Sequence, residues 1–238
     1  MDNIDTLLQG VKEFNIDLDQ NQIRKFAIYK KLLKEWNKKI NITAITDDVE
    51  IDIKHFLDSL TPITSGLFSE NARVIDIGTG GGFPGLPLKI FNENLNISLL
   101  DSLNKRIVFL KELINILELQ GIEAIHGRAE DLGRNPQYRE KYDVCISRAV
   151  ASLNTLSEYC IPFVKLGGHF ISMKGPNVED EVREAEKAIG ILGGRIIDIR
   201  TMKIPQSNIV HSLIIVEKTS ETATKYPRVG GNPKKNPL

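Results

Sequence analysis

Residues 73–85, which read Arg73-Val74-Ile75-Asp76-Ile77-Gly78-Thr79-Gly80-Gly81-Gly82-Phe83-Pro84-Gly85, decide the fold of this chain. The apolar run before the glycines is typical of a buried strand, and the proline after them is typical of a helix start. Because glycine has no Cβ, a glycine-rich turn brings backbone N–H groups close to a ligand. The stretch therefore predicts a strand, a ligand-binding turn and a helix, in that order.

Two ligand fingerprints overlap in this loop. Residues 80–85 satisfy G-x-G-x-x-G, the dinucleotide fingerprint, and Asp101 follows roughly 20 residues later, as that fingerprint requires. A pyrophosphate there would lie near the Asp76 carboxylate, and two anions repel each other in a partly dry site. S-adenosyl-L-methionine instead carries an ammonium, a sulfonium and a single carboxylate for the loop amides to hold. Asp76 therefore favours this cofactor over NAD or FAD, and a plain tight turn is the weaker structural alternative.

The composition fits one large domain, alone or with an extension. The chain has 238 residues, of which 41% are hydrophobic, enough for a substantial core. No segment approaches the roughly 20 apolar residues that span a membrane, and the acidic residues 1–5 are not typical of a signal peptide. Cys145 and Cys160 lack the spacing of metal ligands, so we expect no metal site. We predict a cytoplasmic protein that acts as a monomer.

Basic residues are clustered although the formal net charge is zero. Residues 23–41 contain seven lysines and arginines against Glu35 alone, and the tail after Glu221 contains four more. These are Arg24, Lys25, Lys30, Lys31, Lys34, Lys38 and Lys39, and then Lys225, Arg228, Lys234 and Lys235. Such local clusters can bind RNA phosphates. A solvated helix face and a solubilising tail remain an equal alternative.

The pattern of apolar residues divides the chain into two parts before the tail. Residues 1–66 predict helices, one of them over 21–40 with Trp36 as a core anchor, and another over about 50–61 that ends before Pro62. From Arg73 onward, short apolar strands alternate with amphipathic helices, which predicts a parallel sheet covered on both faces. The predicted strands are 73–77, 97–100, 122–126, 142–146 and 168–173, and the predicted helices are 84–91, 104–120, 152–161 and 177–192.

The last part of the sheet differs from a symmetric dinucleotide fold. Arg195–Thr201 and Ser212–Lys218 predict two strands joined by a loop, an antiparallel pair that completes the sheet. Parallel strands followed by a terminal hairpin fit a methyltransferase better. We therefore predict a helical extension over 1–66, a methyltransferase domain that binds S-adenosyl-L-methionine over 67–220, and a basic, flexible tail over 221–238.

Ligands of open parallel sheets lie outside the carboxyl ends of the strands. The first predicted strand places an acid and the loop glycines there, and the later strands place polar residues there. The candidates are Asp76, Gly78, Gly80 and Gly82, then Asp101, Glu130, Arg148 and Lys174.

Each of these later residues also has a structural alternative. Asp101 is placed to accept hydrogen bonds from ribose hydroxyls, with a helix cap as the weaker interpretation. Glu130 is expected at the adenine or else in a solvated turn. Arg148 follows a buried strand directly, so it is expected to face an anion such as the cofactor carboxylate or a substrate phosphate. Lys174 is the weaker candidate because it could simply be solvated.

Two acceptor motifs are absent after the fourth predicted strand. There is no Asp/Asn-Pro-Pro-Tyr/Phe, which orients an exocyclic amine, and no Pro-Cys, which supplies the nucleophile for C5 methylation. Guanine N7 needs neither, because its lone pair is exposed and it has no proton to lose. No general base is then required, and Arg148 is expected to position an anion rather than the base, because methylation moves positive charge onto the purine.

Five motifs, in order along almost the whole chain, resemble the RsmG family, formerly called GidB. They are residues 35–43 (EWNKKINIT), 55–59 (HFLDS), 76–87, the Leu100-Asp101-Ser102 stretch with Lys105-Arg106, and Ser147-Arg148-Ala149. The resemblance implies a class I S-adenosylmethionine-dependent methyltransferase, an α/β Rossmann-like fold with a mostly parallel seven-stranded sheet, a terminal antiparallel hairpin and preceding helices. It also implies a bacterial enzyme that makes 7-methylguanosine at guanosine 527 of 16S rRNA, with the rRNA or the small ribosomal subunit as its partner.

Matching motif to motif, the resemblance places cofactor contacts at Gly78, Phe83, Ala129, Glu130 and Arg148. Phe83 and Ala129 come from the resemblance alone. His55 belongs to a family motif, but its spacing from Asp58 equally predicts a structural pair on one helix face. Two other functions stay open: an NAD(P)-dependent oxidoreductase and a non-catalytic RNA-binding assembly factor.

Overall fold

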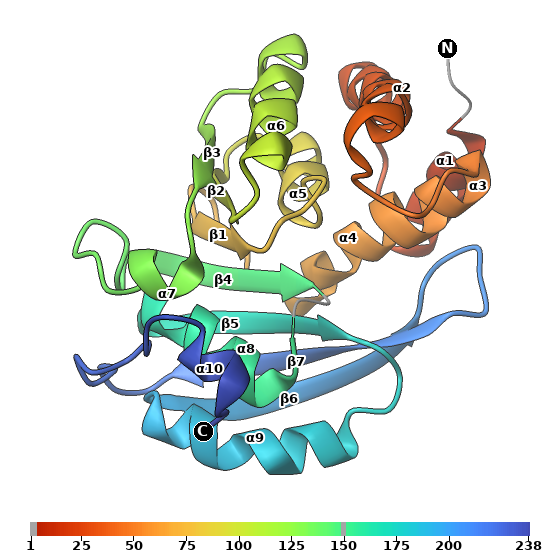
Figure 1. The fold of residues 1–238 in the computed structure, drawn as a ribbon. Helices are drawn as coiled ribbons and strands as arrows, with labels where there is room; N and C mark the ends of the chain where they lie inside the picture. Colours follow the sequence, from red (N-terminus) through yellow and green to blue (C-terminus); the bar gives the residue numbers. More distant parts are fainter. Residues whose placement is uncertain (1–3, 149–150) are drawn as a thin grey trace.

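A computed structural model describes residues 4–148 and 151–238 (Figure 1). Ala149, in the predicted 147–149 motif, and residues 1–3 of the acidic start lie outside the described residues. The described part contains one sheet of seven strands in the order β3-β2-β1-β4-β5-β7-β6. The strands are β1 Arg73–Ile77, β2 Asn96–Asp101, β3 Ile122–His126, β4 Tyr142–Arg148, β5 Val164–Lys174, β6 Gly194–Lys203 and β7 Val210–Lys218.

The pairing of the strands agrees with the predicted fold class. Strands β1 to β5 pair in parallel, and β7 pairs antiparallel with both β5 and β6. The strand order reverses between β1 and β4, and this topological switch point is where open α/β sheets bind ligands. The predicted terminal hairpin is confirmed, with its second strand inserted between β5 and β6.

Helices cover both faces of the sheet. On one face lie α1 to α6, and on the other α8 and α9, with α10 beside α8 and α7 at the edge (Figure 1). The helices are α1 Asp5–Glu13, α2 Gln20–Ile40, α3 Asp48–Ile51, α4 Asp58–Leu60, α5 Gly85–Phe91, α6 Asn104–Ile116, α7 Ala129–Leu132, α8 Leu153–Cys160, α9 Glu179–Ile191 and α10 Asn232–Lys235.

The helix predicted over 50–61 is more irregular than its pattern suggests. Between α3 and α4 the residues Asp52–Leu57 form a π-helical stretch, and Thr61–Ser65 continue α4 as a 3₁₀ turn. The α-helix thus ends at Leu60, before Pro62 as predicted, and the 3₁₀ turn that follows accepts proline near its start. The π-helical stretch contains His55, which lines the cavity described below.

The amino-terminal helices share one hydrophobic core with the sheet. Leu7, Phe26 and Phe56 belong to the same buried cluster as Val74 and Leu99. Packing is thus continuous across the predicted boundary at residue 66.

One of the basic residues of α2 lies inside this packing. The Nζ of Lys30 lies 2.6 Å from Oδ1 of Asp52, and both side chains are buried. Lys30 therefore does not contribute to a basic surface on α2.

The carboxyl-terminal residues differ from the flexible tail that composition predicts. Tyr226, Pro227 and Pro233 are buried, and Arg228 pairs with Glu158 of α8 at 2.6 Å. Glu158 is fully buried, so its carboxylate requires a cationic partner. Composition reveals the basic character of the tail but not this partner, which lies 70 residues earlier.

Within residues 4–148 and 151–238, no helix combines the length and the apolarity that a membrane crossing requires.

Candidate functional site

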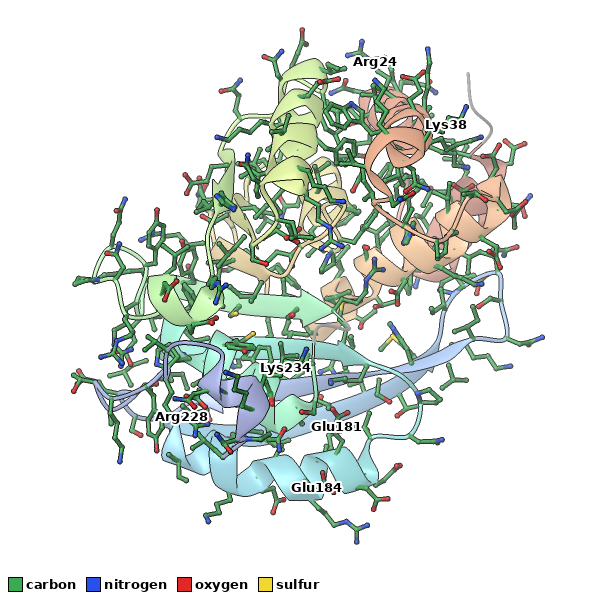
Figure 2. The ribbon with its side chains drawn as sticks, viewed as in Figure 1. Arg24, Lys38, Glu181, Glu184, Arg228 and Lys234 are labelled. Carbon is green, nitrogen blue, oxygen red and sulfur yellow. The ribbon has the colours of Figure 1, made fainter. Side chains whose placement is uncertain are left out.

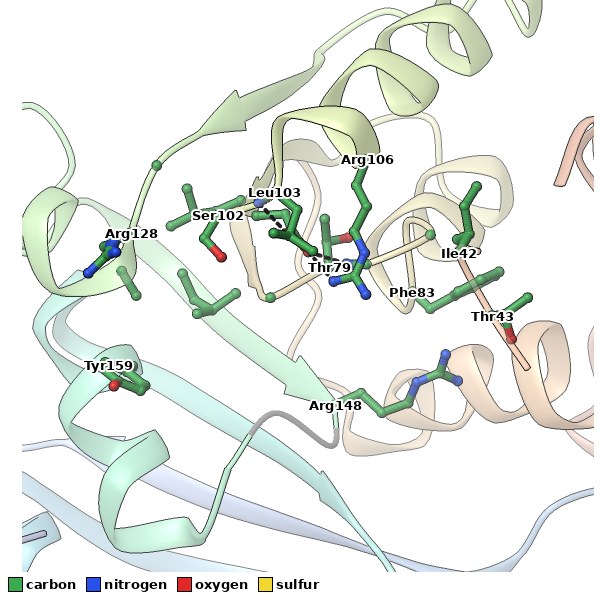
Figure 3. A pocket seen from close by; sticks show the side chains of 18 of the residues that line it. Ile42, Thr43, Thr79, Phe83, Ser102, Leu103, Arg106, Arg128, Arg148 and Tyr159 are labelled. Carbon is green, nitrogen blue, oxygen red and sulfur yellow. Dashed lines mark hydrogen bonds and ion pairs between the residues drawn. The ribbon is translucent and has the colours of Figure 1, made fainter. Parts of the chain in front are cut away.

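A cavity of about 860 Å³ opens at the carboxyl ends of the parallel strands (Figure 3). This volume is in the range of pockets that bind cofactors and other small molecules. One end is formed by Ile42, Thr43, Phe83 and Arg148, and the other end by residues that include Arg128 and Tyr159. The glycine loop and the end of β2 lie between them.

Most of the sequence-predicted cofactor residues meet in this cavity. Seven of the nine line it: Gly78, Gly80, Phe83, Asp101, Ala129, Glu130 and Arg148. Asp76 and Gly82 do not, although both belong to the loop that forms the cavity wall.

Asp76 lies beneath the glycine loop and does not line the cavity. Its side chain is fully buried, and its Oδ2 accepts hydrogen bonds from the Thr79 hydroxyl at 2.7 Å and the Gly85 N–H at 2.9 Å. Burial raises the pKa of Asp76 to about 7 in spite of these bonds. Asp76 therefore ties the end of β1 to the first turn of α5 and sets the shape of the loop.

Gly82 supports the loop from its inner side. Its φ is +102°, and a Cβ added there would lie 2.8 Å from the Tyr29 hydroxyl and 3.0 Å from Leu110. Gly80 differs, because its φ is +61° but a Cβ there would meet nothing closer than 4.0 Å. Gly82 thus permits close packing of the loop on α2 and α6, while Gly80 faces the open cavity.

Several loop amides are already used within the chain. The N–H groups of Gly78 and Thr79 donate to the Leu100 carbonyl, and those of Gly82 and Phe83 donate to the Thr79 carbonyl. The loop therefore contributes mainly a smooth glycine surface to the cavity, and fewer free donors than its glycine content predicts.

Asp101 lines the cavity at the end of β2. Its Oδ2 accepts from the Gly80 N–H at 2.9 Å and from Arg106 at 3.1 Å, and its Oδ1 accepts from the Leu103 N–H at 2.8 Å. The helix-cap interpretation of the sequence is wrong, because Leu103 is the N-cap of α6, although Asp101 accepts a hydrogen bond from the N–H of that residue. The same carboxylate lines the cavity, so it combines loop support with a place at the ligand surface.

Phe83 is the centre of an aromatic stack at one end of the cavity. The His55 ring stacks on it at 4.4 Å and the Tyr29 ring at 5.4 Å between centroids. The Arg148 guanidinium carbon lies 5.1 Å from the Phe83 centroid. The Tyr29 hydroxyl also donates to the Gly81 carbonyl at 2.6 Å, so α2 holds the glycine loop directly.

Arg148 faces an anion, as predicted, but the anion belongs to the chain itself. Its guanidinium donates to Asp58 Oδ2 at 2.7 Å and to the Lys54 carbonyl at 2.9 Å. The other oxygen of Asp58 lies 2.7 Å from His211 Nδ1 on β7. Burial would raise the pKa of Asp58, but His211 and Arg148 together hold it below its ordinary value. Asp58 is therefore an anion that balances the charge of Arg148 at the cavity wall.

His55 is held neutral beside this ion pair. Burial, and next the charge of Arg148, lower the pKa of His55 to about 3. Its Nε2 lies 2.9 Å from the Thr43 hydroxyl, and its Nδ1 lies 3.4 Å from Arg148. An acceptor Nδ1 toward the guanidinium and a donor Nε2–H toward Thr43 satisfy both contacts.

A stability measurement tests the neutral state of His55. Because its pKa is lowered on folding, the unfolded chain takes up the proton first when the pH falls below the ordinary value of 6.5. This group therefore costs the wild type about 2 kcal/mol of stability between pH 6.5 and pH 5. His55→Gln removes that titration. The difference in free energy of unfolding between wild type and His55→Gln, measured by urea denaturation, should therefore be smaller at pH 5 than at pH 6.5 by about 2 kcal/mol. An unchanged difference at the two pH values would contradict the assignment.

The other end of the cavity is built by α7 and α8. Ala129 and Glu130 begin α7, and Tyr159 faces them from α8. Arg128 is exposed and lies 3.9 Å from Glu130. Lys234 of α10 also lines this end.

The remaining candidates from the sequence lie away from the cavity. Lys174 is not solvated, because it pairs with Glu181 of α9 at 2.7 Å and donates to the Ala151 carbonyl. Cys145 and Cys160 are both buried free thiols. No group of three or more His, Cys, Asp or Glu side chains in the described residues is arranged to hold a metal ion.

Several residues of the site have no role assigned from the sequence, among them Tyr29, Thr43, Tyr159 and His211. The sequence predicts Asp58 only as a structural partner of His55, but its carboxylate contacts Arg148 and His211 instead. Asp58 and Thr43 belong to the motifs that carry the family resemblance, which was the available signal for them. Tyr29 and His211 have no local signal, because the fold alone brings α2 and β7 to this end of the sheet.

Comparison with known proteins gives consistent matches. The family model described as rRNA small subunit methyltransferase G matches residues 22–210. Proteins named "Ribosomal RNA small subunit methyltransferase G" are 48% identical in Alkaliphilus metalliredigens and 50% identical in Clostridium botulinum. The first match covers 98% of this chain and 97% of the relative, and the second covers all of both.

Solved structures share the fold at low sequence identity. TYW2 from M. jannaschii in complex with AdoMet has a TM-score of 0.51 at 17% identity, over 67% of this chain and 74% of that one. Precorrin-6y C5,15-methyltransferase from Geobacter metallireducens has a TM-score of 0.51 at 12% identity, over 67% of this chain and 87% of that one. These likenesses support the fold.

Proposed function

Because the chain belongs to the family of rRNA small subunit methyltransferase G, we propose that it transfers a methyl group from S-adenosyl-L-methionine to N7 of guanosine 527 in 16S rRNA. The observation that supports this most is the cavity at the switch point of the sheet, with the glycine loop in its wall and the Phe83–His55–Arg148 cluster at one end.

The cofactor fits the middle and the α7 end of this cavity. Gly78 and Gly80 give a surface without side chains, and Asp101 places a carboxylate at the end of β2 for the ribose hydroxyls. Ala129 and Glu130 then hold the adenosine end. Asp76 and Gly82 act indirectly, because they shape the loop from below. When bound, S-adenosyl-L-methionine supplies an electrophilic methyl group on a sulfonium.

The acceptor base fits the end with Phe83 and Arg148. A guanine N7 has no proton to lose, so the residues at this end need only orient the base and exclude water. His55 is neutral and adds no positive charge opposite the acceptor. Asp58 balances the charge of Arg148, so positive charge can develop on the purine at lower cost.

Methylation of unmodified 16S rRNA with labelled cofactor tests this proposal. We expect label at N7 of guanosine 527 with the full-length chain. Label at another base or atom would contradict the proposed position of methylation. Binding of rRNA without label transfer would favour the assembly-factor alternative. Calorimetric binding of NADH but not of S-adenosylhomocysteine would favour an oxidoreductase.

Substitution of Asp101 should weaken cofactor binding. Asp101→Ala removes an ionic acceptor for the ribose and also the bonds to Gly80 and Leu103. Hydrogen bonds to a charged group contribute about 1.5–3 kcal/mol, so the Kd for S-adenosylhomocysteine should rise at least about tenfold by calorimetry. The control is Asp131→Ala, which removes an exposed acid from α7 outside the cavity. Equal affinities for both variants would remove Asp101 from the site.

A further inference from the structure

The carboxyl-terminal segment is anchored to the wall of the cavity. Arg228 donates to both oxygens of Glu158, at 3.0 Å and 2.6 Å, and its backbone N–H donates to Glu158 at 2.7 Å. Glu158 directly precedes Tyr159, which lines the cavity. Because Glu158 is fully buried, this pair holds the segment at a defined place on α8.

Further contacts on both sides of Arg228 hold the segment. Arg139 donates to the carbonyls of Thr222 and Tyr226, and Arg134 donates to the carbonyl of Pro227. Past Arg228, the Thr155 hydroxyl of α8 donates to the Pro233 carbonyl at 3.1 Å, and Pro233 is buried. The short helix α10 therefore lies beside α8, held by the contacts of Arg228 before it and of Pro233 in its first turn (Figures 1 and 2).

This docking brings Lys234 to the mouth of the cavity. Lys234 lines the cavity together with Arg128 and Tyr159, and its side chain is exposed. In the described part of the chain, Lys234 makes no ion pair. Arg128 is 64% exposed and lies 3.9 Å from Glu130, at the limit of an ion pair. Two exposed cations thus flank the α7 end of the cavity.

The part of the cofactor expected at the α7 end of the cavity has no anion to pair with the two cations there. S-adenosyl-L-methionine carries its only carboxylate on the amino acid part, and its adenosine part has no anion. The acids Asp101 and Glu130 of the cavity already have Arg106 and Arg128 within 4 Å. A cation at the mouth that has no partner among the described residues fits an anion that arrives with the substrate. RNA carries one phosphate per nucleotide, so a strand that inserts a base into the cavity brings phosphates to its rim.

We propose that Lys234, positioned by the docked carboxyl-terminal segment, binds a backbone phosphate of the RNA substrate at the mouth of the cavity. This inference rests on the proposed function, because it requires RNA to enter at this site. Two basic residues of the tail then have different roles. Lys234 contacts RNA, and Arg228 holds the segment in place by binding Glu158.

Lys235 provides a matched control for Lys234. Both lysines lie in α10 and are exposed, but only Lys234 lines the cavity. Lys234→Gln and Lys235→Gln therefore remove the same charge from the same helix. The KM for unmodified 16S rRNA should rise about fivefold for Lys234→Gln and stay near wild type for Lys235→Gln, with the affinity for S-adenosylhomocysteine unchanged in both. The slope of log Kd for RNA against log salt should fall by about 0.7 for Lys234→Gln alone.

A chain that ends after Gly231 is a second test, because it removes α10 with both lysines and leaves Arg228 in place. It should match Lys234→Gln in its KM for RNA. Wild-type RNA affinity in this shortened chain, or equal effects of the two single substitutions, would overturn the inference. A loss of cofactor affinity in Lys234→Gln with an unchanged RNA slope would overturn it too, since Lys234 would then serve the cofactor. If wild type itself fails to methylate 16S rRNA, the proposed function fails, and this result is distinct from the others.

Discussion

Replacement of Arg148 by alanine is expected to reduce methyl transfer by at least about 100-fold. The substitution removes the cation that lies 5.1 Å from the Phe83 ring centroid and leaves Asp58 with His211 alone. The cavity would then lack the Arg148 cation at this end, and the loss of a positioned group at a reacting centre typically costs about 3 kcal/mol of the barrier. Single-turnover methylation with saturating cofactor measures this loss.

Lys174→Ala separates loss of function from loss of stability. Lys174 and Arg148 both end a strand of the sheet and both pair with a partly buried acid, but Lys174 lies outside the cavity. Each substitution should lower the free energy of unfolding by about 1–3 kcal/mol, because it leaves a poorly solvated acid without its cation. Only Arg148→Ala should reduce turnover by at least about 100-fold at a temperature where both variants are folded. Equal and mild effects on turnover would show that Arg148 has a structural role alone.

Gly82→Ala should destabilise the protein by roughly 3 kcal/mol. A Cβ at this position meets the Tyr29 hydroxyl at 2.8 Å and Leu110 at 3.0 Å, and the φ of +102° disfavours any L side chain. Overpacking of a core and a strained backbone each cost about 1–3 kcal/mol. For a domain of this size, the melting temperature should fall by about 2–4 °C per kcal/mol. Activity should fall with it, because the loop loses its support.

Gly80→Ala is the matched control two residues earlier. Gly80 also has a left-handed φ, of +61°, but a Cβ there meets no atom closer than 4.0 Å. It should cost about 1 kcal/mol of stability from backbone strain alone. Since its new methyl group points to the cavity side, it should instead weaken cofactor affinity. If Gly80→Ala lowered the melting temperature as much as Gly82→Ala, the packing of Gly82 on α2 would not be the cause.

The fold could be predicted from the sequence because its signals are local. The apolar runs at 73–77 and 142–146, the glycines between strand and helix and the terminal hairpin each specify their own structure. Because ligands of such sheets lie at the carboxyl ends of the strands, the sequence also predicts that Gly80, Asp101 and Arg148 lie at one edge of the sheet. These parts of the site need no knowledge of distant contacts.

The rest of the site could not be predicted, because the sequence does not show which way some side chains point or which distant residues they contact. Both faces of β1 are buried, so its apolar run does not reveal that the Asp76 carboxylate bonds to Thr79 and Gly85 beneath the loop and does not line the cavity. Composition likewise predicts that Lys30 belongs to a basic surface and that residues 221–238 form a flexible tail. Their buried partners, Asp52 and Glu158, are far away in the sequence and become neighbours only in the folded chain.

The bond between Tyr29 and Gly81 connects the basic helix α2 to the glycine loop of the cavity wall. Tyr29 belongs to α2, the helix with exposed lysines, and its hydroxyl and ring hold the glycine loop and Phe83. A ligand that displaces α2 would therefore change the loop that binds the cofactor. Thermodynamic linkage is reciprocal, so if RNA binds to α2 and the cofactor to the glycine loop, each would change the affinity of the other by the same factor. Tyr29→Phe keeps the ring and removes the bond, which makes it the substitution that reports this coupling.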